Sequence, residues 1–256
     1  MASLDCFSAD LGDGRGDAEP LDVAALARLS PALVVAPHPD DESLGCGGLL
    51  ALLTDAGVEL HALLITDGAA SHPCSRRFDA AARRALRDSE WRQALTCLGL
   101  DDSASHRLGC PDGRVPIAGE AGFAPAVADL AAVVDAIGPG LVLLPWRRDP
   151  HRDHRASHAL ARASIAARAR RPRCLEYIVW AGERGASGDW PRPGEARWWS
   201  LDISSVLDRK RQAIAAHRSQ HGEVITDDPK GFVISSAMRR RAEGPCEHFL
   251  ETNDWQ

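Results

Sequence analysis

Short apolar runs alternate along the chain with longer stretches in which apolar residues recur on one side of a helix. The apolar runs predict strands at residues 33–36, 58–66, 141–144, 175–180 and 198–202. The amphipathic stretches predict helices at residues 43–56, 79–98, 123–137, 155–169 and 206–217. Because a helix separates the first two strands, these strands should run parallel in one sheet. The pattern therefore indicates an α/β protein.

The composition fits one domain of ordinary size. The chain has 256 residues, of which 45% are hydrophobic, and it can bury a substantial core. We expect a single domain over residues 21–256, preceded by a flexible tail at residues 1–20 that is rich in Gly, Asp and Ser. The glycine-rich segment 12–16 lies in this tail and lacks the strand and helix of a phosphate-binding loop.

Charge and cysteine content narrow the possible partners. Thirty basic and 36 acidic residues give a net charge of −6, which disfavours nucleic acid as a partner. No apolar run reaches the roughly 20 residues that span a bilayer, and no secretory pattern is present, so we expect a cytoplasmic protein without a membrane span. The 7 cysteines are scattered and form no C-x-x-C pair, which predicts reduced or buried thiols. Any metal must then be held by histidine and carboxylate.

One imidazole and three carboxylates follow the first predicted strand, between His38 and Glu42. Open α/β sheets bind ligands at the carboxyl ends of such strands. The adjacent carboxylates of Asp40 and Asp41 would repel each other there unless a positive charge lay beside them. A divalent metal held by His38 with Asp40 or Asp41 meets this need, and these ligands suit zinc, with iron or manganese as alternatives. The other interpretation, in which both aspartates cap the next helix, leaves His38 unexplained.

A second histidine motif follows the predicted strand at residues 141–144, where His-Arg-Asp-His occupies residues 151–154. Neither motif is convincing alone, but the two are complementary. Together His38, Asp41 and His154 would supply three ligands and leave a coordination position open for water or substrate. An open position is typical of a catalytic metal rather than a structural one.

The remaining polar residues of the two motifs can be given roles in catalysis. Asp40 is the spare carboxylate and would serve as the base for a metal-activated water. We expect His151 to stabilise an oxyanion as an imidazolium, or to protonate a leaving amine, with Asp153 orienting it. His158 lies one helical turn after His154 and is expected to support the site or to lie on the helix surface.

Residues 36–42 and 151–154, which contain these side chains, resemble the histidine motifs of the PIG-L or LmbE-like deacetylases. Members of that family remove acetyl groups from compounds that contain N-acetylglucosamine. Supporting segments resemble secondary motifs of the family and extend the resemblance over about residues 32 to 220; they lie at residues 66–68, 87–90, 109–113 and 210–220.

The resemblance implies a Rossmann-like three-layer α/β fold with a mostly parallel central sheet, flanking helices and a smaller C-terminal extension. It implies Zn²⁺ bound by His38, Asp41 and His154. It also implies that Asp40 is the general base and that His151 acts as electrostatic stabiliser or acid. These roles agree with those reached from the residues themselves.

The resemblance further suggests that Arg87 and Asp112 line a sugar pocket. The ordinary alternative for Arg87 is a local ion pair with Glu90, three residues later on the same predicted helix. One departure concerns tyrosine. Some sugar deacetylases of the family have a tyrosine just before the second histidine motif, whereas here residues 149–150 are Asp and Pro and the only tyrosine is Tyr177.

The leading hypothesis is a zinc-dependent hydrolase that removes the acetyl group from an N-acetylated amino sugar, in a glycoconjugate or small glycoside. One alternative is an amidase that acts on a related non-acetyl conjugate. Another is a sugar- or nucleotide-binding module of the same fold without catalysis. The sequence leaves the oligomeric state open, including a homo-oligomer.

Overall fold

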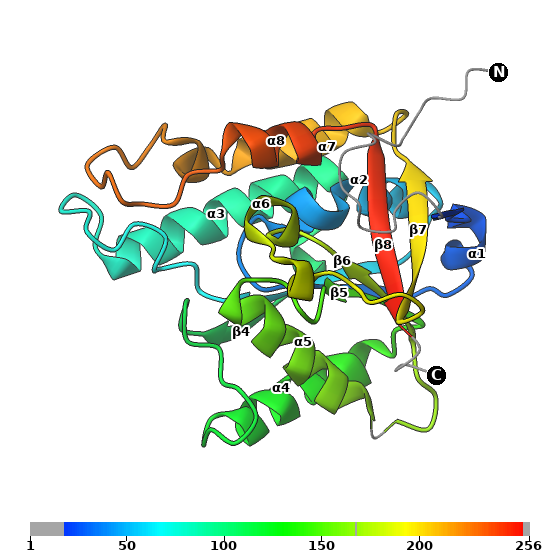
Figure 1. Cartoon of the computed structure of the whole chain (residues 1–256). Helices are drawn as coiled ribbons and strands as arrows, with labels where there is room; N and C mark the ends of the chain where they lie inside the picture. The colour runs from blue at the N-terminus through cyan, green and yellow to red at the C-terminus, as the bar shows by residue number, and fades with distance from the viewer. Residues whose placement is uncertain (1–17, 167, 253–256) are drawn as a thin grey trace.

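An eight-stranded sheet runs through the centre of this computed structural model, which describes residues 18–166 and 168–252 (Figure 1). The order of its strands is β1-β7-β8-β6-β5-β2-β3-β4. Their bounds are β1 Glu19–Pro20, β2 Ala32–Ala36, β3 Leu60–Thr66, β4 Ser105–Cys110, β5 Leu141–Pro145, β6 Arg173–Tyr177, β7 Ala196–Asp202 and β8 Cys246–Thr252. Strands β2 to β6 are parallel, and β8 is antiparallel to both of its neighbours.

Helices cover both faces of the sheet, so the expected three-layer α/β fold is confirmed (Figure 1). In the view of Figure 1, α2, α3, α7 and α8 lie above the sheet, and α4 and α5 lie below it. The helix bounds are α1 Val23–Ala27, α2 Asp41–Asp55, α3 Ala80–Leu98, α4 Phe123–Ile137, α5 Arg152–Ala166, α6 Ala181–Arg184, α7 Leu207–Ala216 and α8 Ser236–Ala242. Short 3₁₀ turns occur at η2 Asp102–Ala104, η3 Ser187–Asp189 and η4 Arg218–His221.

The apolar strands are fully buried because both of their faces are covered. In β2, Val34 packs into the core shared with α2, α3 and α7, whereas its neighbours Leu33 and Val35 pack into the core shared with α4 and α5. Since β2 to β6 are parallel, their carboxyl ends lie along one edge of the sheet. The polar residues that follow β2, β3, β4 and β5 are therefore brought together at that edge.

The C-terminal part of the chain contributes both to a helical layer and to the sheet itself. Strand β8 lies between β6 and β7, where its residues Phe249 and Leu250 are completely buried. The polar pattern of residues 221–256 did not predict this strand.

Cys246, at the start of β8, is disulfide-bonded, which departs from the expectation of reduced thiols. Free thiols are found at Cys46, Cys74, Cys97, Cys110 and Cys174.

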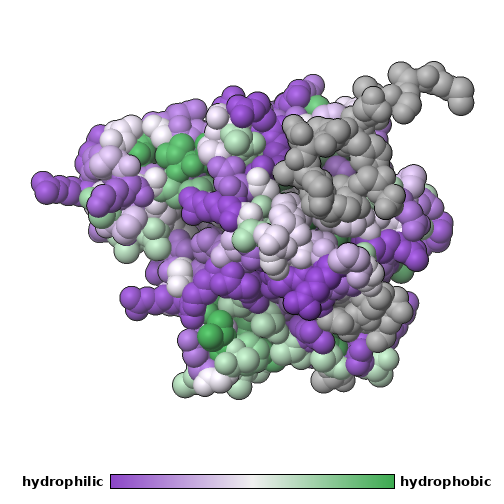
Figure 2. All heavy atoms as spheres, viewed as in Figure 1, coloured by the Kyte–Doolittle hydropathy of each residue, from purple (hydrophilic) through white to green (hydrophobic). Residues whose placement is uncertain are grey.

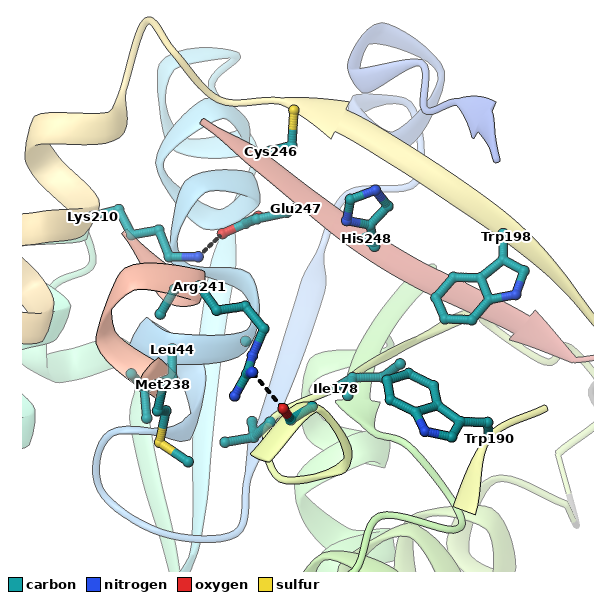
Figure 3. Close-up of a pocket in the computed structure, with 14 residues that line it drawn as sticks. Leu44, Ile178, Trp190, Trp198, Lys210, Met238, Arg241, Cys246, Glu247 and His248 are labelled. Atoms are coloured by element: carbon teal, nitrogen blue, oxygen red, sulfur yellow. Dashed lines mark hydrogen bonds and ion pairs between the residues drawn. The ribbon is translucent and has the colours of Figure 1, made fainter. Parts of the chain in front are cut away.

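A buried ion pair supports the helix that carries Asp41. Helix α2 is interrupted at Cys46, where φ is −147° and ψ is 19°. The Glu247 carboxylate of β8 accepts the backbone N–H groups of Gly48 (2.7 Å) and Leu49 (2.8 Å), just after this interruption. Lys210 Nζ of α7 donates to the same carboxylate at 2.7 Å (Figure 3). Because the helix restarts there, Glu247 serves as its N-terminal cap, and Lys210 neutralises the buried charge.

Helix α2 packs so closely on β6 that a methyl group at Gly45 has no room. A Cβ atom there would lie 2.3 Å from Cδ2 of Tyr177, whose ring is completely buried and whose hydroxyl donates to the carbonyl of Val35 at 2.7 Å. We expect Gly45→Ala to lower the free energy of unfolding by about 1–3 kcal/mol, as overpacking does, in denaturant titration. Gly188→Ala is the matched control, because nothing lies within 4 Å of its Cβ position. Equal stability of the two variants would contradict this close packing.

The segment expected as a tail lies mostly outside the described residues, which begin at residue 18. Residues Glu19–Pro20, at its end, pair in parallel with β7.

None of the helices in the described residues has both the length and the apolar character needed to cross a membrane. The face in Figure 2 is mostly hydrophilic, with scattered hydrophobic areas.

Candidate active site

The predicted ligands meet where the ends of β2 and β5 lie side by side. His38 follows β2, Asp41 is the first residue of α2, and His154 lies in the first turn of α5. Asp41 Oδ2 lies 3.1 Å from His38 Nδ1 and 3.1 Å from His154 Nε2. All three side chains thus surround one point at the carboxyl edge of the sheet.

The donor set at this point fits a divalent metal. His154 is completely buried, and its Nε2 atom, which faces Asp41, makes no well-oriented hydrogen bond with a described residue. Such orphaned buried nitrogens are rare unless a ligand completes them. Ring nitrogens of His38, His151 and His154 lie within 4.8 Å of one another. Imidazole nitrogens with a carboxylate oxygen are ligands that borderline divalent metals prefer.

The buried carboxylates at this point stabilise positive charge on their neighbours, as the raised pKa values of His38 and His154 indicate. Although burial opposes its charged form, hydrogen bonds with Asp112, Asp153 and Asp41 raise the pKa of His38 well above its usual value. Burial also opposes the charged form of His154, but Asp41 and Asp149 outweigh it and raise the pKa of His154 to about 9. Protons on the imidazoles or a bound cation can supply this charge, so metal binding would release protons.

Further carboxylates contact the two histidines that are predicted as ligands. Asp153 Oδ2 lies 3.1 Å from His38 Nε2 and also accepts the backbone N–H of Gly113 at 2.7 Å. This arrangement differs from the expectation that the Asp153 carboxylate orients His151. Asp112 Oδ1 lies 3.4 Å from the same His38 nitrogen. A carboxylate behind a ligating histidine fixes its tautomer and ring orientation, so these residues position His38.

Asp149 plays the same part for His154, and the sequence did not single it out for this role. Its Oδ1 lies 3.5 Å from His154 Nδ1, and the carboxylate also accepts the backbone N–H groups of His151 (3.0 Å) and Trp180 (2.9 Å). The available signal was an aspartate two residues before the second motif, in the segment that follows a buried strand.

Replacing Asp149 should weaken metal binding without removing a ligand. We expect Asp149→Asn to lower metal affinity about 10- to 100-fold, because the amide cannot hold His154 in the tautomer that the carboxylate selects. Competition with a chromogenic chelator measures this affinity. Asp135→Asn is a suitable control, because Asp135 lies on the exposed side of α4 and pairs with Arg168. Unchanged affinity in Asp149→Asn would show that the carboxylate does not position His154.

Asp40 stands apart from its neighbour Asp41 in backbone and surroundings. It is the one non-glycine residue with positive φ (140°) in the described parts of the chain. Arg87 Nη2 donates to the carbonyl of Pro39 and lies 3.3 Å from Asp40 Oδ2. Burial raises the pKa of Asp40 to about 6; the Arg87 charge opposes this shift and the Asp41 charge reinforces it. This is the range in which a carboxylate serves well as a general base.

A buried network behind Asp40 supports its strained backbone. Glu42 Oε2 accepts the Asp40 N–H at 3.3 Å and Nε1–H of Trp91 at 3.1 Å. Glu42 Oε1 accepts the Ser43 hydroxyl at 2.6 Å and faces His217 Nε2 at 3.5 Å. The sequence placed Glu42 in the motif but gave no role for it, because two of its partners, Trp91 and His217, lie far from it in the chain.

His151 is held as a neutral donor. Its Nδ1 accepts the backbone N–H of Asp153 at 3.2 Å, so the proton of the neutral ring belongs on Nε2. Burial, followed by the charges of His38 and His154, lowers the pKa of His151 to about 4. Its ring stacks on Trp180 at 5.6 Å between centroids. This differs from the imidazolium expected from the sequence.

The candidate residues open into a cavity of about 590 Å³. Its floor includes His38, Asp40, Asp41, Arg87 and Asp112. Arg87 is 2% exposed, and its Nε and Nη1 atoms have no hydrogen-bond partner in the described part of the chain. The alternative of a local ion pair with Glu90 is wrong, because Arg87 pairs with Asp40 instead, while the Glu90 carboxylate accepts the backbone N–H and hydroxyl of Ser219.

Comparison with known proteins places this geometry in a family. The model of the family described as "PIG-L: GlcNAc-PI de-N-acetylase" matches residues 33–165, which include both histidine motifs. The chain belongs to the PIG-L family. The resemblance noted in the sequence is therefore confirmed, and the PIG-L segment runs from β2 through α5.

Relatives within this PIG-L family are deacetylases of several N-acetylated sugars. The chain is 31% identical over 239 residues to the 2'-N-acetylparomamine deacetylase of Streptomyces fradiae, covering 85% of this chain and 83% of the relative. It is 28% identical over 201 residues to a probable N-acetyl-alpha-D-glucosaminyl L-malate deacetylase of Bacillus cereus, covering 76% and 86%. The solved N,N'-diacetylchitobiose deacetylase of Pyrococcus horikoshii shares the fold, with a TM-score of 0.58, 23% identity and coverage of 78% and 74%.

The tyrosine found in some PIG-L deacetylases has no counterpart at the site. Tyr177 is completely buried against Gly45, and its hydroxyl donates a hydrogen bond to the Val35 carbonyl. It therefore supports the packing of α2 on the sheet and does not reach the cavity, whose described lining does not include it. The stacked pair His151 and Trp180 occupies the wall of the cavity instead.

Proposed function

We propose that this protein is a zinc-dependent N-deacetylase that hydrolyses the acetamide of an N-acetylated amino sugar. The observation that carries the proposal is the Asp41 carboxylate placed between His38 and His154, with Asp40 beside it on the floor of the same cavity. Membership of the PIG-L family, whose named relatives act on N-acetylated sugars, supports it.

His38, Asp41 and His154 would hold the zinc ion. When bound, the metal supplies a Lewis acid that polarises the acetyl carbonyl and makes water more acidic. Asp153, Asp112 and Asp149 keep the two imidazoles in orientation, as their contacts with His38 and His154 indicate.

Asp40 moves the proton. Its carboxylate takes a proton from the attacking water as the new C–O bond forms at the acetyl carbon. It then gives that proton to the sugar nitrogen as the C–N bond breaks, which leaves acetate and a free amine. A pKa of about 6 allows the carboxyl group to act in both directions near neutral pH.

His151 and Arg87 hold the reacting group. Nε2–H of His151 would donate to the carbonyl oxygen as negative charge develops on it, while the Asp153 backbone N–H holds Nδ1. Arg87, with two unpartnered nitrogens on the cavity floor, and Asp112 would bind hydroxyl groups of the sugar.

Acetate release and metal content test the proposal directly. Purified protein should contain about one zinc per chain and should release acetate from N-acetylglucosaminides, with loss of activity on chelation and recovery on zinc addition. Exclusive turnover of non-acetyl conjugate amides would favour the amidase alternative. Absence of stoichiometric metal and of hydrolysis would favour a binding module.

A further inference from the structure

Two exposed cations lie at the mouth of the cavity, away from its buried floor. Arg184 ends α6, and Lys230 lies in the loop between η4 and α8, drawn in orange in Figure 1. Both side chains are exposed and both line the cavity that contains His38. Neither forms an ion pair with a described residue.

Arg184 is held in place by an aromatic ring. Its guanidinium carbon lies 4.5 Å from the ring centroid of Trp180. Trp180 is itself fixed, because it stacks on His151 and packs against Phe232 at 5.3 Å between centroids. A guanidinium stacked on a fixed indole loses little freedom when it binds a carboxylate or phosphate. The stack also connects the mouth to His151 on the cavity wall.

The acidic residues nearest these cations in sequence have other partners. Glu183 Oε2 lies 3.4 Å from Arg241 Nη2. Asp228 accepts the backbone N–H groups of Cys74 at 2.7 Å and of Lys230 at 3.0 Å. Their charge is therefore partly taken up by these contacts.

The carboxylates that line the cavity are gathered at its floor. They belong to Asp40, Asp41 and Asp112 and face Arg87 and His38. The positive charge of the mouth is consequently not matched by carboxylates among the described lining residues. A polar group that enters beyond the sugar would meet two cations and an aromatic wall.

We propose that Arg184 and Lys230 bind an anionic group on the aglycone of the substrate, so that the protein prefers N-acetylated amino sugars whose aglycone carries a carboxylate or a phosphate. This inference rests on the proposed deacetylase function and specifies its substrate class. The acetamide lies at the floor beside Asp40, and the aglycone extends towards α6 and the loop before α8.

Matched substrates test this preference. Acetate release is measured for an N-acetylglucosaminide with a carboxymethyl aglycone, for its uncharged methyl ester, and for a phosphoethyl analogue. We expect kcat/KM of the zinc-loaded wild type to be about tenfold higher for the carboxylate than for the ester, with the preference falling as salt rises. The phosphoethyl substrate shows which of the two anions is favoured.

The variant Arg184→Ala/Lys230→Ala should reduce the carboxylate-to-ester ratio to within about twofold of unity. Because the ratio compares two substrates on one preparation, a partly unfolded sample does not alter it. Arg28→Ala is the matched control, since Arg28 is exposed and lies by the opposite edge of the sheet, and it should keep the wild-type ratio.

The outcomes separate this inference from the proposed function. Equal kcat/KM for acid and ester in the wild type, or an unchanged ratio in the double variant, would overturn the anionic preference and leave the deacetylase function standing. If the zinc-loaded wild type released no acetate from any of these or from simple N-acetylglucosaminides, the proposed function itself would fail, and the inference with it.

Discussion

Asp40→Asn is expected to lower kcat about 10²- to 10⁴-fold while the protein keeps its metal. The amide has nearly the shape of the carboxylate but cannot take a proton from the attacking water. Since Asp40 is not among the three proposed ligands, metal content should stay at the wild-type value. Steady-state acetate release and elemental analysis of the same preparation measure the two quantities.

The neighbouring residue provides the control for this experiment. Asp41→Asn replaces the carboxylate that lies 3.1 Å from both His38 Nδ1 and His154 Nε2, so this variant should lose metal as well as activity. If Asp40→Asn lost its metal and Asp41→Asn kept it, the roles given to the two aspartates would have to be exchanged.

His154→Ala should abolish stoichiometric metal binding and lower kcat/KM by on the order of 10³-fold or more. The substitution removes a buried residue of the proposed ligand set, and the chemistry that a bound metal would supply is worth several kcal/mol in the transition state. Metal analysis after dialysis, together with acetate release at high zinc concentration, measures both effects. Excess zinc should restore little of the activity.

His158→Ala is the corresponding control on the same helix. His158 is buried one turn further along α5, and its Nε2 lies 3.5 Å from Glu176 Oε2, outside the proposed ligand set. This variant should keep its metal. Full metal content and full activity in His154→Ala would show that the proposed ligand set is wrong.

The local pattern of apolar and polar residues was sufficient to predict the helices and strands that surround the site. Helix α4 was predicted at its observed bounds, and strands β2, β3 and β5 were placed to within two residues. These elements could be predicted because their apolar residues face cores on one or both sides. Helix α5 begins at Arg152, three residues before the predicted start, since polar residues of the second motif form its first turn.

Strand β8 shows where local pattern is insufficient. Its buried polar residues Glu247 and Thr252 are satisfied by Lys210 and Glu176, which come from distant parts of the chain. A polar residue in a candidate strand argues against burial of that strand unless a hydrogen-bond partner is known, and the sequence does not show these partners. The same reasoning applies to the short helix α6, which lies in a Gly- and Pro-rich segment and was not among the predicted helices.

For the site, the sequence identified the residues that meet but not how each is held. The rule that parallel strands end at one edge was enough to bring His38 and His154 together. The assignment of Asp153 to His151 relied on closeness in sequence, whereas its carboxylate faces His38 across 115 positions of the chain. The support that Asp149 gives to His154, and Glu42 to Asp40, likewise depends on the folded arrangement.

The backbone conformation of Asp40 limits which residues can occupy position 40 without loss of either stability or activity. A φ of 140° is one that glycine adopts freely and other residues adopt at a cost of about 1–3 kcal/mol. Glycine at this position would relieve that strain but remove the carboxylate that is proposed to transfer the proton. If Asp40 is the base as proposed, a more stable fold and a faster reaction favour different residues at position 40, and the strained backbone is retained together with the carboxylate.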